Sequence, residues 1–185
     1  MSLTPSKMLP IGTPAPDFKL LDPSTQEFFS LNSFSKAPAL LVMFICNHCP
    51  YVKHFKKELA AFCADYSKKG AAIVGINSND AEEYPEDSPE KMALEKKTWN
   101  YSFPYLFDSS QSCAKSYDAA CTPDFFLFDK NRKLVYRGQF DDSRPGNGKP
   151  ITGKDLGAAL DAVLRGESPT TIQNPSIGCN IKWRS

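Results

Sequence analysis

The segment Leu40–His54, LLVMFICNHCPYVKH, changes character at its centre. Up to Ile45 it is a continuous apolar run, as expected of a β-strand that is buried on both faces. Beyond Pro50, apolar residues recur at intervals of three and four, which is the period of an amphipathic helix. The tetrapeptide Cys46-Asn47-His48-Cys49 therefore lies at the boundary between a predicted strand and a predicted helix.

A second buried strand follows this helix. Gly70 is expected to end the helix, and the run 71–76 (AAIVGI) is again continuously apolar. A strand, a helix and a strand at this spacing predict a βαβ unit with parallel strands. Further elements are expected as hairpin strands at 18–21 and 27–29, a helix over 89–99, a strand at 105–107, a serine-capped helix over 110–117, hairpin strands at 125–128 and 134–137, and a helix over 152–164.

The length of 185 residues predicts one domain over 1–185, with an N-terminal segment 1–16 and a C-terminal tail 166–185. The acidic stretch 77–89, NSNDAEEYPEDSP, is expected to be a solvated loop. The loop at 141–150 is expected to be held by its own Asp and Arg side chains.

Composition excludes several classes of partner. Lys and Arg number 22 against 21 Asp and Glu, so no electrostatic case exists for nucleic-acid binding. The sequence has no dense block of Lys and Arg of the kind that binds a membrane surface. The apolar run at 37–46 is too short to span a bilayer. The N-terminus has no apolar signal-peptide region, so a cytoplasmic location is expected.

The Cys pair has three explanations: a metal site, a structural disulfide or a redox couple. A reducing compartment disfavours a disulfide framework for the six cysteines. A zinc site needs four ligands, yet His48 and His54 are the only histidines and no second Cys-x-x-Cys is present. We therefore expect no metal and no cofactor. A redox couple suits the position, because a helix start stabilises a thiolate.

Four segments resemble one superfamily. They are GTPAPDFKL (12–20), LLVMFICNHCPYVKH (40–54), ACTPDFFLFDKNRKLVYRGQFDDSRPG (120–146) and PSIGCNIKW (175–183). The chain resembles the thioredoxin-like superfamily and, within it, peroxiredoxin-like proteins of the alkyl hydroperoxide reductase/thiol-specific antioxidant type that retain a Cys-x-x-Cys. This resemblance implies an α/β thioredoxin fold: a central mixed β-sheet flanked by helices on both faces, here with an N-terminal hairpin extension.

The resemblance also implies a second part of the site. Thr122-Pro123 is similar to the threonine–cis-proline turn that faces the redox pair in this superfamily and exposes backbone for pairing with a substrate chain. Asn47, Pro50 and Thr122 are accordingly expected to contribute to substrate docking.

Three positions depart from the relatives. Ile45 stands where thioredoxins carry a tryptophan, and Leu40 stands where they carry a buried acid, so proton transfer needs another group or water. Cys49-Pro50 is similar to the peroxidatic Cys-Pro of peroxiredoxins, but Cys46 replaces their threonine and Pro123 aligns with their arginine. Without those donors, peroxide is poorly polarised.

The resemblance to thioredoxins makes Cys46, as the more exposed sulfur, the attacking thiol and Cys49 the resolving one. His48 is expected either to lower a thiolate pKa or hold the geometry by a hydrogen bond, or to be a solvent-facing spacer. Cys121 is expected close to the pair, and both Cys121 and Cys179 are candidates for additional redox thiols. Two further cysteines, Cys63 and Cys113, are expected to be a core residue and a residue without a role.

The leading hypothesis is a thiol–disulfide oxidoreductase whose catalytic residues are Cys46, Cys49, His48 and Pro123. Its partners would be protein or small-molecule disulfides or thiols, together with a reductant that the sequence does not identify. One alternative is a thiol-dependent peroxidase that uses Cys49. Another is a non-catalytic redox-sensing or partner-binding module.

Overall fold

The computed structural model describes residues 3–185, so the first two residues of the expected segment 1–16 lie outside it. Its helices are α1 (Pro50–Lys68), α2 (Pro89–Trp99), α3 (Ser112–Ser116) and α4 (Lys154–Leu164), with 3-10 helices η1 (Leu31–Phe34) and η2 (Pro85–Asp87). Its strands are β1 (Leu3–Pro5), β2 (Lys19–Asp22), β3 (Glu27–Ser30), β4 (Leu40–Phe44), β5 (Ala72–Asn77), β6 (Tyr105–Phe107), β7 (Cys121–Thr122), β8 (Asp124–Phe128), β9 (Leu134–Arg137) and β10 (Ile177–Asn180).

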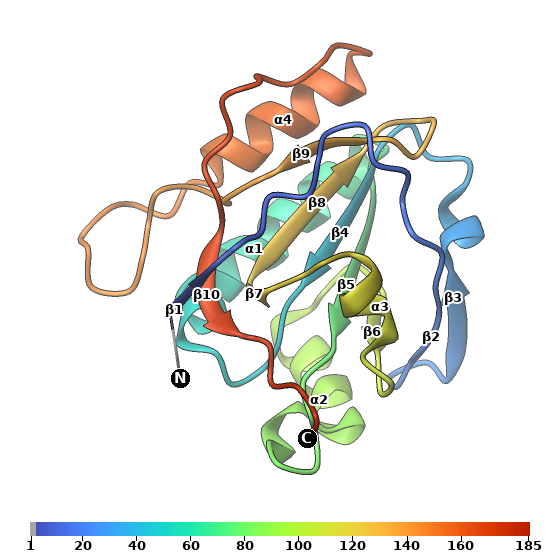
Figure 1. The fold of residues 1–185 in the computed structure, drawn as a ribbon, viewed down its shortest axis with the longest axis vertical. Coiled ribbons are helices and arrows are strands. Elements are labelled where there is room, and N and C mark those ends of the chain that lie inside the picture. Colours follow the sequence, from blue (N-terminus) through green and yellow to red (C-terminus); the bar gives the residue numbers. More distant parts are fainter. Residues whose placement is uncertain (1–2) are drawn as a thin grey trace.

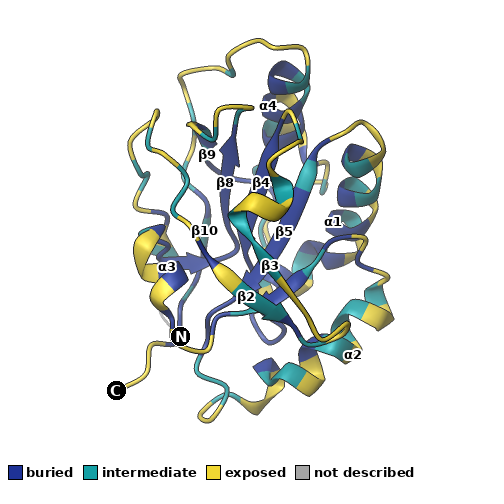
Figure 2. Cartoon of the chain, turned by 90° about the vertical axis from the view of Figure 1, so that its right-hand side faces the viewer, coloured by how far each residue is buried: buried dark blue, intermediate teal, exposed yellow. Residues whose placement is uncertain are grey.

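The main sheet has seven strands in the order β3-β2-β6-β5-β4-β8-β9 (Figure 1). The central strand β4 pairs in parallel with β5 and antiparallel with β8. The predicted βαβ unit β4-α1-β5 is therefore confirmed, and so is the hairpin formed by β2 and β3. Every residue of β4 is buried, which explains its unbroken apolar sequence (Figure 2).

Helices cover both faces of this mixed sheet, which is the expected thioredoxin-like arrangement. On one face, Leu41 and Met43 of β4 pack in a core with residues of α1 and α4. On the other face, Leu40 and Phe44 pack with Tyr117, which follows α3. The two faces of β4 thus hold the layers together, and the strand delivers the Cys-x-x-Cys segment to the start of α1.

A second sheet was missed in the sequence. β10 pairs antiparallel with β1 on one side and with β7 on the other. No strand was predicted in either the N-terminal segment or the C-terminal tail. Strands this short carry no readable alternation, because they form only where a partner backbone satisfies their hydrogen bonds.

Two further local expectations were wrong. Helix α3 begins at Ser112 after Gln111, and the carboxylate of Asp108 accepts hydrogen bonds from amides of its first turn, whereas a Ser110 cap was expected. The stretch 77–89 is not a wholly solvated loop, because Asn77 and Asp87 are fully buried. An acidic composition predicts solvation, but it does not reveal that one carboxylate is enclosed by hydrogen-bond donors.

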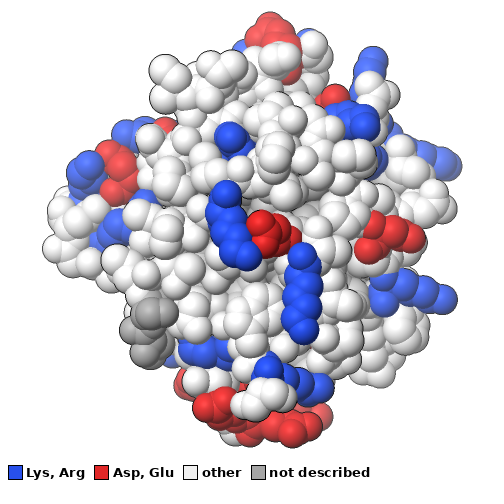
Figure 3. All heavy atoms as spheres, viewed as in Figure 1, with Lys and Arg blue, Asp and Glu red and all other residues white. Residues whose placement is uncertain are grey.

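On the face seen in Figure 3, blue and red side chains are scattered among uncharged atoms, except at the lower edge, where red side chains gather. Within residues 3–185, no helix combines the length and the apolar character needed to cross a membrane.

The loop at 141–150 is held as expected, because Asp141 accepts hydrogen bonds from Ser143 and Arg144 donates to the carbonyl oxygen of Asp141.

We predict that Gly75→Ala destabilises the protein by about 1–3 kcal/mol through overpacking. A Cβ atom on Gly75 would lie 2.9 Å from the Phe103 ring and 3.1 Å from the Ile45 side chain, next to Cys46. Gly157→Ala in α4 is the control, because its Cβ would meet the hydroxyl end of the Tyr66 side chain at 3.1 Å. Urea denaturation measures both. Equal stability of Gly75→Ala and wild type would contradict this packing.

Candidate active site

Cys49 is the N-cap residue of α1, and Pro50 occupies the first helical position. Its backbone is extended, with φ −65° and ψ 125°, so the chain turns from β4 into the helix within the Cys-x-x-Cys segment. The first turn of a helix carries amide groups without intrahelical partners and the positive end of the helix dipole. This local geometry places Cys49 in a positive field.

The peptide bond between Thr122 and Pro123 is cis, as expected. Thr122 contacts both cysteines. The Thr122 hydroxyl and Cys46 Sγ form a hydrogen bond of 3.3 Å, and Cys49 Sγ lies 3.2 Å from the Thr122 carbonyl oxygen. One residue of the cis-proline turn thus holds the two sulfurs in place.

A third sulfur joins this pair. Cys179 of β10 lies opposite Thr122 in the small sheet, and its Sγ is 2.8 Å from Cys49 Sγ. Cys46, Cys49 and Cys179 are all in the reduced thiol form. From the sequence, Cys179 was assigned to the C-terminal tail 166–185. In the structure it lies in direct contact with Cys49.

The three cysteines of the site are buried from solvent. Cys46 is 2% exposed, Cys49 0% and Cys179 4%. The position at the strand–helix junction was expected to leave at least one sulfur accessible, and the backbone at Thr122 was expected to be exposed for a substrate chain. Both expectations were wrong, because β10 pairs with β7 and occupies that edge with the chain's own backbone.

The surroundings shift the pKa values of the two thiols of the motif in opposite directions. Burial raises the pKa of Cys46, and its contact with Cys49 and the negative charge of Asp87 raise it further. A hydrogen bond from Cys46 lowers the pKa of Cys49 against the effect of burial, with help from Cys179 and the Val52 amide. These fields favour a thiolate at Cys49, whereas the sequence analysis named Cys46 as the attacking sulfur.

Asp87 is the buried acid that the sequence analysis did not find. It is 0% exposed, and its carboxylate accepts hydrogen bonds from the Asn47 amide at 2.7 Å and from the Asn79 side chain at 2.8 Å. Burial opposes ionisation, but the hydrogen bonds from His48 and Asn79 lower the pKa of Asp87. Only its place in an acidic, proline-containing segment marked it in the sequence.

His48 points inward and is no solvent-facing spacer. Its Nδ1 lies 2.5 Å from Asp87 Oδ2, and its ring stacks on Tyr84 with centroids 5.1 Å apart. The Asn47 side chain is similarly engaged, since it donates to the Glu86 carbonyl oxygen and accepts from the Tyr105 hydroxyl. A docking role for Asn47 and Pro50 stays a prediction.

Cys46, His48 and Asp87 could place ligand atoms within 4.8 Å of one another, which would suit a metal ion. However, His48 and Asp87 already bind each other, and a tetrahedral site needs a fourth ligand. The arrangement fits a histidine–carboxylate pair beside a thiol.

The other cysteines differ in their surroundings. Cys121 lies next to the site, with its Sγ 3.4 Å from the Pro123 carbonyl oxygen, and burial strongly raises its pKa. Burial likewise raises the pKa of Cys63, which belongs to the core as expected. Cys113 lies in the core on the opposite face of the sheet, remote from the pair.

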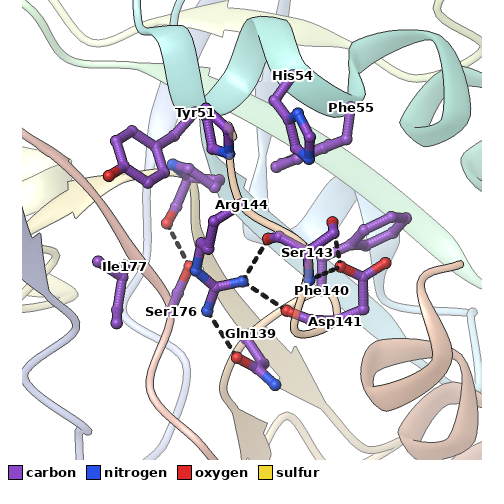
Figure 4. A pocket seen from close by; sticks show the side chains of 12 residues that line it. Tyr51, His54, Phe55, Gln139, Phe140, Asp141, Ser143, Arg144, Ser176 and Ile177 are labelled. Atoms are coloured by element: carbon purple, nitrogen blue, oxygen red, sulfur yellow. Dashed lines mark hydrogen bonds between the residues drawn. The ribbon is translucent and has the colours of Figure 1, made fainter. Parts of the chain in front are cut away.

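A small hollow beside the cis-proline turn is shown in Figure 4. Tyr51 and Ile177 lie on its rim. The guanidinium of Arg144 faces into the loop, where it donates to the carbonyl oxygens of Asp141 and Ser143 and to Gln139 Oε1. These loop oxygens engage Arg144, and no hydrogen bond joins it to a sulfur of the described site.

The fold and the cis-proline turn define a thioredoxin-like protein. The model of the AhpC/TSA family matches residues 11–137, which is more than half of the chain, and the protein therefore belongs to the AhpC/TSA family. Family membership supports a thiol-based, thioredoxin-like redox function. No curated protein matches the chain.

Several solved structures resemble this chain. A hypothetical protein of Sinorhizobium meliloti is 55% identical, covers 98% of this chain and 99% of its own, and superposes with a TM-score of 0.97. Two more distant structures share the fold. The thioredoxin domain of a Bacteroides vulgatus thiol-disulfide oxidoreductase is 21% identical (74% and 90% covered, TM-score 0.59). A peroxidoxin of Mycobacterium tuberculosis is 17% identical (84% and 96% covered, TM-score 0.61).

A second buried acid supports the cis-proline turn. Asp124 directly follows Pro123, is 0% exposed and accepts a hydrogen bond from the Ala120 amide. Burial, only partly offset by hydrogen bonds from Ser6 and backbone amides, raises the pKa of Asp124 to about 7.

We predict that Asp124→Asn weakens the pH dependence of stability. The folded protein holds the Asp124 proton up to about pH 7, whereas an unfolded chain releases it near ~3.9. As the pH rises between these values, this group lowers the free energy of unfolding of the wild type. Asp124→Asn has no carboxyl group to titrate at this position, so its free energy of unfolding does not show this fall. Urea denaturation across this range measures it, with the exposed Asp65→Asn as control, and identical pH profiles for Asp124→Asn and wild type would refute it.

Proposed function

We propose that the protein is a thiol–disulfide oxidoreductase that uses the Cys46–Cys49 dithiol. The observation that carries the proposal is the contact of both sulfurs with Thr122 of the cis-proline turn, at the start of a 19-residue helix. A helix N-terminus lowers thiol pKa values, and a neighbouring second thiol completes the exchange. Family membership in AhpC/TSA is consistent with this chemistry.

The electrostatics favour Cys49 as the attacking sulfur. Its thiolate attacks one sulfur of a substrate disulfide, forms a mixed disulfide and expels the other substrate sulfur as a thiolate. Cys46 then attacks Cys49 Sγ, which forms the Cys46–Cys49 disulfide and releases the second substrate thiol. The substrate gains two electrons and the dithiol loses two. A reducing thiol pair from outside restores the dithiol by the reverse exchange.

Cys46 must lose its proton before it attacks, because burial and Asp87 keep its pKa high. The His48–Asp87 pair lies beside it and can accept that proton. In this way the chain replaces the buried acid that thioredoxins carry at the position of Leu40. Asp87 is thus a positioning residue that acts through His48.

A thiol peroxidase is the second candidate, favoured by the burial of all three sulfurs, which suits a small oxidant better than a protein. The Cys49 thiolate would attack a peroxide oxygen and form a sulfenic acid, with the leaving oxygen departing as water or an alcohol after protonation. A second thiol would then condense with the sulfenic acid and release water. The nearby Arg144 donates to loop oxygens, so its guanidinium is not placed to polarise a peroxide at Cys49.

We predict that Cys49→Ser reduces turnover of a fluorogenic peptide disulfide, with dithiothreitol as reductant, to the uncatalysed level. Cys46→Ser retains the first attack but loses its resolving partner, so mass spectrometry detects a disulfide at Cys49. Cys113→Ser, on the opposite face of the sheet, serves as the control and turns over normally. Wild-type turnover by both Cys46→Ser and Cys49→Ser would end the proposal. Rapid consumption of hydrogen peroxide that only Cys49→Ser abolishes would support the peroxidase instead.

We predict that Asp87→Asn slows resolution of the mixed disulfide by roughly 100-fold or more, as expected when general-base assistance is lost. Cys179→Ser is used as the parent, so that Cys46 alone resolves. Because hydroxide must then remove the Cys46 proton, the rate should keep rising with pH where the parent has reached a plateau. Quenched-flow mass spectrometry follows the mixed disulfide. The same pH profile in both proteins would show that Asp87 only supports the structure.

A further inference from the structure

The C-terminal strand β10 occupies the place that the resemblance assigns to a substrate chain. It pairs antiparallel with β7, immediately before the cis-proline, and Cys179 stands opposite Thr122. Its sulfur lies 2.8 Å from Cys49 Sγ. A substrate cysteine docked for exchange would need the same two features: backbone pairing with β7 and a sulfur in contact with Cys49.

We propose that Cys179 is an internal exchange partner of Cys49, so that the oxidised protein carries a Cys49–Cys179 disulfide. The proposal rests on the thiol–disulfide function argued above and adds a third thiol to it. Cys49 then has two alternative partners, Cys46 on its own segment and Cys179 on β10.

This exchange of one disulfide for another needs no outside oxidant. Once Cys46 and Cys49 have formed their disulfide, Cys179 attacks Cys49 Sγ. The Cys49–Cys179 bond forms, the Cys46–Cys49 bond breaks, and the proton of Cys179 passes to Cys46. No net electron transfer occurs, because one disulfide replaces another.

The surroundings of Cys179 favour its attack only after Cys49 has been oxidised. In the reduced protein, burial and the contact with Cys49 raise the pKa of Cys179. When Cys49 enters a disulfide its negative charge is lost, while the Lys182 charge and the Tyr51 amide, which both favour a Cys179 thiolate, remain. Oxidation of Cys49 thereby makes Cys179 a better nucleophile.

The backbone of β10 is adapted to this close approach. A Cβ atom on Gly178 would lie 2.0 Å from the carbonyl oxygen of Thr122, so only glycine allows β10 to lie so near β7. Ser176 donates a 2.6 Å hydrogen bond to the Pro123 carbonyl oxygen on one side of Cys179. On the other side, the Ile181 amide donates to the Ala120 carbonyl oxygen at 3.2 Å. The strand is held against the cis-proline turn at both ends.

The experiment uses glutathione disulfide as the probe, an acid quench and non-reducing peptide mapping. In Cys46→Ser, we expect Cys49 to become linked to Cys179. In Cys179→Ser, we expect the Cys46–Cys49 disulfide. Cys121→Ser is the matched control, because this buried thiol lies in the same small sheet, and its disulfide map should equal that of the wild type.

A persistent Cys49–glutathione disulfide in Cys46→Ser, with Cys179 still alkylated after denaturation, would overturn the role of Cys179. The proposed function would survive that result, since Cys49 would still have attacked a disulfide. Absence of any reaction at Cys49 would instead overturn the proposed function.

A second variant tests the placement of β10 with every thiol retained. In the Cys46→Ser background, Gly178→Ala should slow formation of the Cys49–Cys179 disulfide by roughly 100-fold, the cost of displacing a reacting atom by ~1 Å. Circular dichroism checks that the variant is folded. An unchanged rate in a folded Gly178→Ala protein would show that the position of β10 does not govern the exchange.

Discussion

The contact of Thr122 with the cysteines at the start of α1 is the interaction on which the site depends. The hydroxyl of Thr122 bonds Cys46, its carbonyl oxygen lies beside Cys49, and its backbone pairs with the strand that carries Cys179. The cis peptide bond that follows it directs the chain into β8, next to β4. Helix start, cis-proline turn and C-terminal strand therefore meet at one residue.

The C-terminal tail connects this centre to the buried acid. Beyond β10, the Lys182 amide donates to Asn79 Oδ1 at 2.9 Å, and the Asp80 amide donates to the Lys182 carbonyl oxygen at 2.9 Å. Asn79 in turn donates to Asp87, which binds His48. Thus the segment that covers the sulfurs also positions the pair proposed to accept the Cys46 proton. The C-terminal segment and the His48–Asp87 pair are therefore joined by a continuous set of hydrogen bonds.

Much of the fold follows from local sequence. The unbroken apolar run of β4 and the helical period of α1 predict the βαβ unit, and α2 was placed at its observed bounds because Pro89 suits the first turn of a helix. The cis-proline turn was expected only from the family resemblance. Asp87 and β10 could not be predicted, since the burial of a carboxylate and the pairing of a four-residue strand arise from contacts between distant segments. The choice between Cys46 and Cys49 as the attacking sulfur meets the same limit, because the motif alone does not show that Asp87 lies nearby and raises the pKa of Cys46.

The proposed chemistry depends on a thiolate at Cys49 that the helix start and the neighbouring thiols stabilise. The direct measurement is the ultraviolet absorbance of the thiolate against pH, taken as the difference between the reduced wild type and Cys49→Ser. We predict that the thiolate absorbance reaches its midpoint at a pH well below ~8.5, the ordinary pKa of a free cysteine. A midpoint at or above that value would contradict it.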